Sequence, residues 1–331
     1  MPRSVPRWFP AAALFGLAAT AAAGLALGSA PVAAAEALRA LLRAAGAPVS
    51  VPDATYTIVV ELRLPRVALA AVVGAALATS GAVYQGLFRN PLADPYVIGV
   101  ASGAALGAVG VISAGLGGLW VVGAAFAAGV GTVAVVFRLA AARRAAPEDL
   151  LLAGLAVGSF LAAVLSVVLV LSHSSLQQAL AWLLGSFGGR GWPHLALALP
   201  AVAAGYALAR WHARELDVLL LTEDEAAAAG VDVPSVRRRL LAAATLLAAA
   251  SVASAGVVGF VGLVVPHAVR RVVGPGHAAL LPGSAVCGAA LLVWADLAAR
   301  TAASPLEIPV GALTALLGVP FFLWLLVRRE A

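Results

Sequence analysis

The sequence contains no lysine, a single cysteine and few charged residues of either sign. All 21 of its basic residues are arginines. A P-loop nucleotide site needs a lysine on the phosphates, and Schiff-base chemistry needs a lysine amine, so a complete P-loop ATPase and a retinal or pyridoxal protein are both excluded. The single cysteine, Cys287, excludes an internal disulfide and a four-cysteine iron–sulfur site.

Hydrophobic residues make up 63% of the chain and charged residues only 11%, with a mean hydropathy of +1.01. A soluble domain carries about 25% charged residues, so this chain is expected to be an all-α polytopic membrane protein. At about 20 residues per crossing, its apolar runs leave room for about ten transmembrane helices in a single domain, residues 1–331. We expect these helices near residues 8–27, 64–87, 92–112, 118–138, 150–171, 193–210, 238–257, 259–270, 278–299 and 309–327.

The arginines fall in the gaps between the apolar runs, so the pI of about 10.6 does not indicate a nucleic-acid partner. If the N-terminus is cytoplasmic, fifteen arginines lie on the cytoplasmic side and six on the other. The positive-inside rule then predicts that both termini are cytoplasmic.

The first apolar run lies between two arginines and an alanine-rich segment, a pattern that also fits a cleaved signal peptide. Its length of about 20 residues suffices to span a bilayer, so we favour a retained first helix. Residues 33–44 are expected to form a short amphipathic helix on the outer surface, where Glu36 can pair with Arg39 or Arg43. Residues 46–62 are expected to form a periplasmic loop.

Glycines recur at every fourth residue in two of the expected helices. Gly99, Gly103 and Gly107 lie in the third helix, and Gly154 and Gly158 lie in the fifth. Small residues at this spacing let helix backbones approach closely in lipid. We therefore expect both stripes to pack against neighbouring helices.

The longest polar insertion, Arg210–Arg239, is predicted to be cytoplasmic. Within it, Thr222 followed by Glu225 fits a capping box. Gly230 is a natural helix stop, and Asp232 precedes the next apolar run. The pattern predicts a short helix outside the membrane, which is either a solvated connector or a docking element.

Asp296 is the one carboxylate well inside an apolar run. An intramembrane acid is a candidate functional group. Arg300 follows one helical turn later, a spacing that allows an ion pair. We favour a structural pair with Arg300 over proton coupling.

The histidines give no specific site. His267 and His277 are separated by a Gly-Pro-Gly break and do not share a helical face. Structural hydrogen bonding is the favoured interpretation, and His173 and His194 are equally ambiguous. No metal site is predicted.

Three ordered blocks of sequence resemble one family of membrane proteins. The first is Arg63–Gly99, with Arg-Leu-Pro-Arg at its start and the turn Arg-Asn-Pro-Leu-Ala-Asp-Pro near its end. The others are Gly256–His267 and the stretch that begins Glu307–Gly311. Together they are similar to the permeases of ABC importers for iron–siderophore, haem and cobalamin uptake, the FecCD-type family. The resemblance runs from about residue 60 to 327 and implies a type II ABC importer permease architecture.

The resemblance implies three functional regions. The arginines at its motif positions are Arg63, Arg66 and Arg300. They would meet acidic residues of a periplasmic binding protein, although they could instead anchor to lipid phosphates. The loop before the fifth helix, with Pro147, Glu148 and Asp149, would narrow the pathway as a cytoplasmic gate. Its two acids also suit the start of a helix. A coupling helix in the loop at about 211–237 would contact the ATPase: Thr222, Glu223, Asp224, Glu225, Ala226, Ala227, Ala228, Ala229 and Gly230.

The resemblance also implies a transport subunit rather than an enzyme, without a cofactor of its own. Its partners would be a second copy of the chain, two ATP-binding cassette subunits that bind ATP, and a periplasmic substrate-binding protein. It would lie in the bacterial cytoplasmic (inner) membrane. The expected substrate is an iron–siderophore or haem, ahead of cobalamin.

Two other function classes fit the sequence less well. An ion-coupled secondary transporter should carry several ionisable groups at the membrane midplane, and Asp296 is the one offered here. An intramembrane hydrolase would need a nucleophile or metal motif, and Gly-x-Ser-x-Gly and His-Glu-x-x-His are both absent from the sequence.

Overall fold

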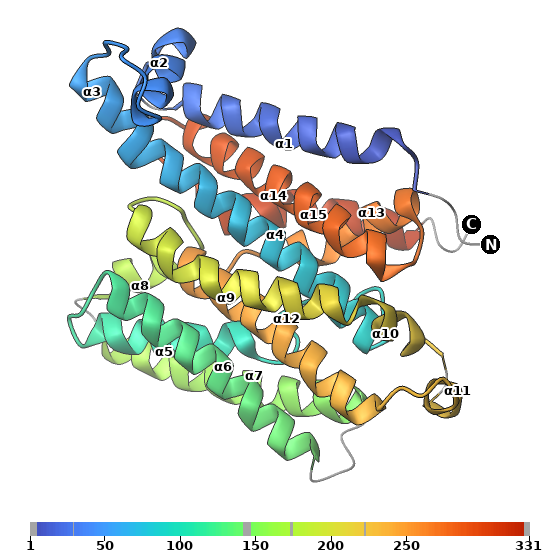
Figure 1. The fold of residues 1–331 in the computed structure, drawn as a ribbon. Helices are drawn as coiled ribbons and strands as arrows, with labels where there is room; N and C mark the ends of the chain where they lie inside the picture. The colour runs from blue at the N-terminus through green and yellow to red at the C-terminus, as the bar shows by residue number, and fades with distance from the viewer. Residues whose placement is uncertain (1–4, 29, 142–146, 173–174, 222, 328–331) are drawn as a thin grey trace.

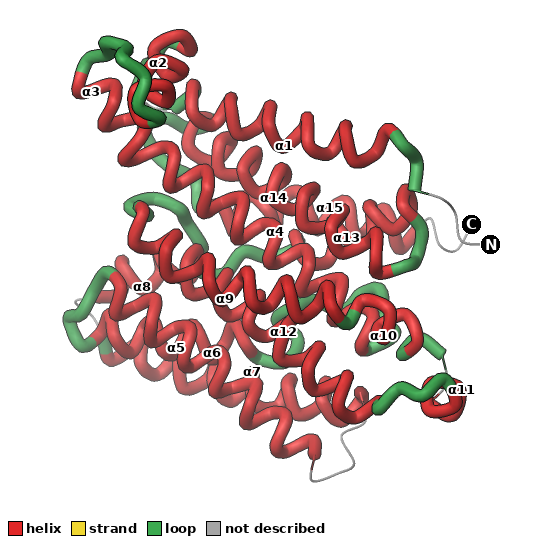
Figure 2. Tube along the Cα trace, in the orientation of Figure 1, coloured by secondary structure: helices red, strands yellow, loops and turns green. Residues whose placement is uncertain are grey.

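The computed structural model describes residues 5–28, 30–141, 147–172, 175–221 and 223–327. Within these residues the chain is a bundle of helices joined by short loops, without strands (Figure 1, Figure 2). Ten helices correspond in order to the ten expected from the sequence. They are α1 (Trp8–Ala26), α4 (Leu64–Leu87), α5 (Val100–Ser113), α6 (Leu119–Ala141), α7 (Pro147–Leu171), α9 (Trp192–Trp211), α12 (Val233–Ala255), α13 (Val261–Val273), α14 (His277–Thr301) and α15 (Val310–Val327).

Seven helical stretches of the described chain are long and apolar enough to cross a membrane. They include α1, α6, α7, α9, α12, α14 and a continuous run, Asp53–Leu87, that contains α4. The other three expected helices, α5, α13 and α15, are shorter. A multi-pass all-helical fold is therefore confirmed.

The short helices gather at two opposite ends of the bundle (Figure 1). One end, which we call the α2 end, carries α2 (Ala34–Ala44), α3 (Asp53–Tyr56) and α8 (Leu176–Leu183). The opposite end, the α10 end, carries α10 (Ala213–Val218), α11 (Glu223–Ala228) and the start of α1.

Small residues hold the core helices together. The helices α4 and α12 have 78% of their apolar windows buried, and α4 packs along α14. Gly74 of α4 faces Gly288 of α14 so closely that a methyl group on either would collide with the backbone of the other. A methyl group on Gly81 of α4 would likewise collide with the backbone of Gly262 in α13, and one on Gly262 would collide with Pro95 and the Leu77 carbonyl. Close backbone approach of this kind is the usual packing mode of helices in lipid.

The glycine stripes predicted from sequence also pack as expected. Gly103 lies against Thr132 and Ala128 of α6, and Gly107 lies against Ala124 and Ala128. In α7, Gly154 contacts the backbone at Ile98, just before α5.

Two expected boundaries are wrong. The predicted loop at 46–62 is helical from Asp53, through α3 and a π-helical segment, Thr57–Arg63, that leads directly into α4. It is ordered because Val59 and Val60 are buried against α2, together with Ala40. The amphipathic helix expected at 33–44 is confirmed as α2, although Arg43 pairs with Asp53, with 3.0 Å between Nη1 and Oδ1.

The helix expected at 92–112 begins only at Val100. The preceding turn is fixed by Asp94, whose Oδ1 accepts the Tyr96 N–H at 2.8 Å. Gly99 then adopts a positive φ of 82°, which favours glycine. Asn, Asp and Pro in this stretch compete with helix formation, which delays the start of α5.

Candidate functional site

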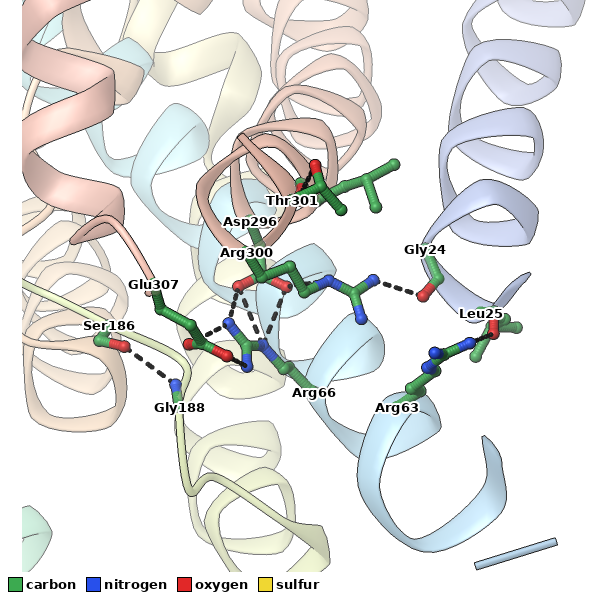
Figure 3. Close-up of polar contacts among 11 residues, drawn as sticks. Gly24, Leu25, Arg63, Arg66, Ser186, Gly188, Asp296, Arg300, Thr301 and Glu307 are labelled. Carbon is green, nitrogen blue, oxygen red and sulfur yellow. Dashed lines mark hydrogen bonds and ion pairs between the residues drawn. The ribbon is translucent and has the colours of Figure 1, made fainter. Parts of the chain in front are cut away.

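Three arginines singled out in the sequence meet at the α2 end of the bundle (Figure 3). Arg63 ends the π-helical segment, Arg66 lies in the first turn of α4, and Arg300 lies in the last turn of α14. The close contact between α4 and α14 brings their ends together. π-Helical turns recur at functional sites, which makes this segment a candidate site.

Arg63 is buried and binds the end of α1. Its Nη1 donates to the carbonyl oxygens of Leu25 and Ala26, each at 2.8 Å, and its Nη2 donates to Ala30 at 2.5 Å. The last carbonyls of a helix have no partner within the helix. Arg63 therefore caps α1 and joins it to α4, with only 5% of its surface exposed.

Arg66 is held by two carboxylates from different parts of the chain. Its Nη2 and Nε donate to Asp296 Oδ1 at 2.8 and 3.0 Å. Its Nη1 and Nη2 donate to Glu307 Oε1 and Oε2 at 2.9 and 3.0 Å. Such two-pronged pairs are the strongest geometry that a guanidinium offers to a carboxylate. The buried Asp296 is 1% exposed, whereas Glu307 is 39% exposed.

Arg300 is also buried and binds α1, while its buried Nε makes no hydrogen bond. Its Nη2 donates to the carbonyl of Gly24 in α1, and its Nε lies 3.7 Å from Asp296 Oδ2. The expected pair between Asp296 and Arg300 is therefore present but secondary, because the shorter bonds of Asp296 go to Arg66. A structural role for Asp296 agrees with this geometry.

A cavity of about 360 Å³ opens beside these arginines. Its charged lining consists of Glu61, Arg63, Arg66, Arg190, Arg300 and Glu307. Four arginines against two glutamates make the cavity wall electropositive. We call this the arginine cavity.

At the α10 end, the loop that carries α10 and α11 is tied to the bundle. Asp217 of α10 accepts the backbone N–H of His277 at 2.9 Å, and its Oδ1 lies 2.5 Å from the His277 ring Nδ1. His277 is the first residue of α14, so the carboxylate caps that helix. Arg89, just after α4, donates to the carbonyls of Leu219, at 2.8 Å, and Leu221.

Comparison with known proteins identifies the fold and the family. Residues 16–328 match the FecCD transport family. The chain belongs to this family. It is 49% identical over 284 residues to the cobalamin import system permease protein BtuC of Halobacterium salinarum, covering 85% of this chain and 76% of that protein.

Other relatives carry different names. The chain is 43% identical to the hemin transport system permease protein HmuU of Yersinia pestis, covering 85% of this chain and 86% of that one. It is 40% identical to the Fe(3+) dicitrate transport system permease protein FecD of Escherichia coli K12, covering 83% and 86%. A solved structure described as an inward-facing metal-chelate type ABC transporter superposes with a TM-score of 0.85 at 31% identity, covering 96% of this chain and 98% of that one.

For this FecCD permease, the coupling region expected from the sequence is partly described. Thr222 lies outside the described residues, while Glu223–Ala228 forms α11 as expected. Gly230 follows with a positive φ of 77°, and Asp232 caps α12 by accepting the Ser235 N–H at 3.3 Å. The short helix expected in this loop is confirmed, and its position outside the membrane stays a prediction.

The expected gate residues begin α7. Pro147 is the first residue of that helix and Asp149 is half-buried in its first turn; the side chains of Pro147 and Glu148 lie outside what the structure describes. Of the ambiguous histidines, His194 accepts the Gly191 N–H at 3.3 Å through Nδ1, and His173 lies outside the described residues. Among the described residues, no three His, Cys, Asp or Glu side chains are grouped to hold a metal ion.

Three groups in these sites were not assigned by sequence reasoning. Glu307 stands in the third block of sequence that resembles the family, and no neighbouring residue indicates that it reaches Arg66. Arg190 lies in a glycine-rich loop. The contact of Asp217 with His277 joins residues 60 positions apart, and no local sequence pattern predicts it.

Proposed function

We propose that this FecCD-family chain is the permease subunit of an ATP-driven importer that moves a metal chelate from the periplasm to the cytoplasm. The observation that carries the proposal is the match of the whole bundle, in sequence and in structure, to ABC permeases. The relatives are named for cobalamin, hemin and ferric dicitrate. Their common chemistry is a metal held in an organic chelator, and iron–siderophore complexes belong to the same class.

In the proposed assembly, two copies of the chain meet two ATP-binding cassette subunits and a periplasmic binding protein in the cytoplasmic membrane. The α10 end and both termini face the cytoplasm, in agreement with the arginine distribution. The chain binds no ATP itself, since it has no lysine for a P-loop. A second copy would cover part of α7, whose exposed apolar side chains include Leu152, Leu155 and Phe160.

Each end of the bundle has a proposed role in this assembly. At the cytoplasmic end, α11 and its flanking residues contact the ATPase, and Pro147–Asp149 narrow the pathway. At the periplasmic end, the region of Arg63, Arg66 and Arg300 receives the binding protein. All three arginines have acceptors within the chain. Arg63 and Arg300 are buried, so they support the docking surface from beneath and are not free cations on it.

The test is reconstitution into liposomes of the chain alone and of the chain with its ATPase and binding protein. We expect chelate uptake only in the complete system, with ATP supplied on the side of the membrane where the ATPase lies. Vanadate should inhibit this uptake. Empty liposomes and the complete system without ATP are the controls. Uptake by the isolated chain, driven by an ion gradient and insensitive to vanadate, would show a secondary transporter instead.

A further inference from the structure

An apolar groove lies between α6 and α12, which pack side by side (Figure 1). Its volume of about 340 Å³ is within the range of small-ligand sites. Each helix contributes residues at positions i, i+3, i+4 and i+7, so the two walls are one helical face each. We call this the α6–α12 groove, and its lining consists of Val130, Val133, Ala134 and Phe137 of α6 and Arg238, Leu241, Ala242, Thr245 and Leu246 of α12.

The groove opens to the surface of the bundle. Ala134 and Ala242 are exposed, one on each wall, whereas Val133 and Leu241 beside them are buried. Both helices belong to the stretches that are long and apolar enough to cross a membrane. The surroundings of the groove in a bilayer are therefore hydrocarbon, and an apolar chain is the matching occupant.

The length of the groove suits one leaflet. Its α12 wall runs from Arg238 to Leu246, a rise of about 12 Å along the helix axis. One leaflet supplies about 15 Å of hydrocarbon, half of the apolar core of a bilayer. A single acyl chain lying along the helices would thus follow the groove from the level of its headgroup inward.

The polar groups of the lining leave one cation at one end. The Thr245 hydroxyl is already engaged, because it donates to the Leu241 carbonyl at 2.7 Å and lies 3.3 Å from the Tyr84 hydroxyl. Arg238 is the one charged residue of the lining. It is exposed and makes no hydrogen bond or ion pair with another described residue.

More positive charge gathers at this end of the groove. Arg238 is the middle one of three consecutive arginines, 237–239, and Arg138 lies in the last turn of α6. Asp232 is the acid that precedes them in α12, and its carboxylate caps that helix. The groove therefore combines an apolar trough with an electropositive mouth, which is complementary to an amphiphile with an anionic head.

We propose that the α6–α12 groove binds an acyl chain of an anionic phospholipid whose phosphate pairs with Arg238. A guanidinium binds phosphate oxygens in two-pronged geometry. A soluble anion would leave the apolar lining uncovered, and a lipid without net charge would add no counter-charge to the arginines. The lipid belongs to the leaflet at the α10 end, which is the cytoplasmic leaflet in the proposed topology.

The headgroup is expected to set the selectivity of the site. A chain that moves from the bilayer into the groove exchanges one apolar environment for another, so the hydrophobic effect favours neither. An arginine at an anionic membrane surface contributes about 1 kcal/mol, which is about fivefold in affinity. The site needs only a bilayer around the bundle, so it is tested independently of transport.

The first test compares Arg238→Gln with the matched control Arg239→Gln. Arg239 is the next residue of α12 and is also exposed, but it does not line the groove. The full-length chain is placed in nanodiscs that contain phosphatidylglycerol and phosphatidylcholine, with a photoreactive acyl chain on one lipid or the other. Mass spectrometry then measures the yield of cross-links to residues of the groove.

We expect wild type to favour phosphatidylglycerol about fivefold over phosphatidylcholine in these cross-links. Arg238→Gln should remove most of that preference, while Arg239→Gln should change it less than twofold. Absence of a preference in wild type would overturn the proposal. Equal losses in the two variants would also overturn it, because they would show a general effect of surface charge.

The second test fills the groove without changing any charge. Ala242→Leu places a larger side chain in the lining, and the control Ala203→Leu makes the same change at an exposed position of α9 outside the groove. With thermal stability unchanged, Ala242→Leu should lower the cross-links in the groove several-fold and Ala203→Leu should leave them as in wild type. Undiminished cross-linking in Ala242→Leu would show that the acyl chain lies elsewhere.

A second copy of the chain is the competing occupant. In a Cys287→Ala background, Ala134→Cys provides a single thiol on the exposed wall of the groove. We expect this variant to stay monomeric on denaturing gels after mild oxidation, since lipid covers the position. An efficient disulfide-linked dimer would assign the groove to an interface between copies and overturn the lipid site.

Discussion

At the residue scale, the two carboxylates that bind Arg66 differ in burial and therefore in their contribution to the stability of the fold. Asp296 is 1% exposed and Glu307 is 39% exposed. Removing one partner of a buried ion pair leaves an uncompensated charge, whereas water screens the loss at an exposed position. The structure therefore ranks two substitutions that remove the same charge from the same arginine.

We expect Asp296→Asn to lower the free energy of unfolding by about 3–5 kcal/mol, because Arg66 and Arg300 both lose their buried counter-charge. The matched variant, Glu307→Gln, should cost only about 0.2–1 kcal/mol. Thermal unfolding of both variants in detergent, followed by size-exclusion chromatography, measures the difference. Equal losses would contradict the ranking.

The pH dependence gives the same prediction a second readout. Hydrogen bonds from Arg66 hold the pKa of the Glu307 carboxyl below its ordinary value of 4.5. The contribution of Glu307 is therefore complete above that ordinary pKa and is lost as the pH falls through the lower pKa of the folded state. The stability difference between wild type and Glu307→Gln should disappear at acid pH, and a constant difference would contradict the pair.

At the scale of elements, periodic and punctuating residues predicted much of the fold. Apolar runs predicted ten helices, and the Thr222 and Gly230 signals predicted α11. The stripe of Gly103 and Gly107 predicted a close helix contact, found with α6. The pairing of α4 with α14 was not predicted, because it joins Gly74 to Gly288 across more than 200 residues and neither glycine has another glycine four residues away.

The same contact explains why the arginine site escaped local reasoning. Arg66 and Asp296 lie 230 residues apart, and they meet only because α4 and α14 pack together. The family resemblance identified the three arginines, but their acceptors come from α1, the segment just after it, α14 and the loop before α15. Acceptors supplied by tertiary packing leave no pattern beside the arginines.

We expect Gly74→Ala to destabilise the bundle by about 1–3 kcal/mol, because the added methyl group forces α4 away from the backbone at Gly288. The control is Gly110→Ala in α5, where an added methyl group meets no atom within 4 Å. Higher helix propensity should make that control neutral or stabilising by up to about 1 kcal/mol. Thermal unfolding of both variants is the measurement, and similar melting temperatures would contradict the close contact.

At the scale of the whole molecule, α4 and α14 connect the two ends of the bundle. At the α2 end they carry Arg66 and Asp296. At the α10 end, Asp217 caps α14, and Arg89 binds the loop just after α10. A displacement of the α10–α11 loop would therefore be applied directly to the helix pair that shapes the arginine cavity.

We expect Asp217→Asn to weaken this connection without unfolding the bundle, since losing a helix cap costs about 1 kcal/mol. In the reconstituted importer, chelate uptake per ATP hydrolysed should fall several-fold, while ATPase assembly and basal hydrolysis persist. The matched control is Glu215→Gln in the same helix, because the ion-pair partner of Glu215 is His212, with 3.4 Å between Oε1 and Nδ1, rather than a residue of α14. If both variants keep the wild-type ratio of uptake to hydrolysis, the contact between Asp217 and His277 fixes the loop in place but transmits no motion. If Asp217→Asn alone lowers the ratio, motion of the α10–α11 loop reaches the bundle through α14.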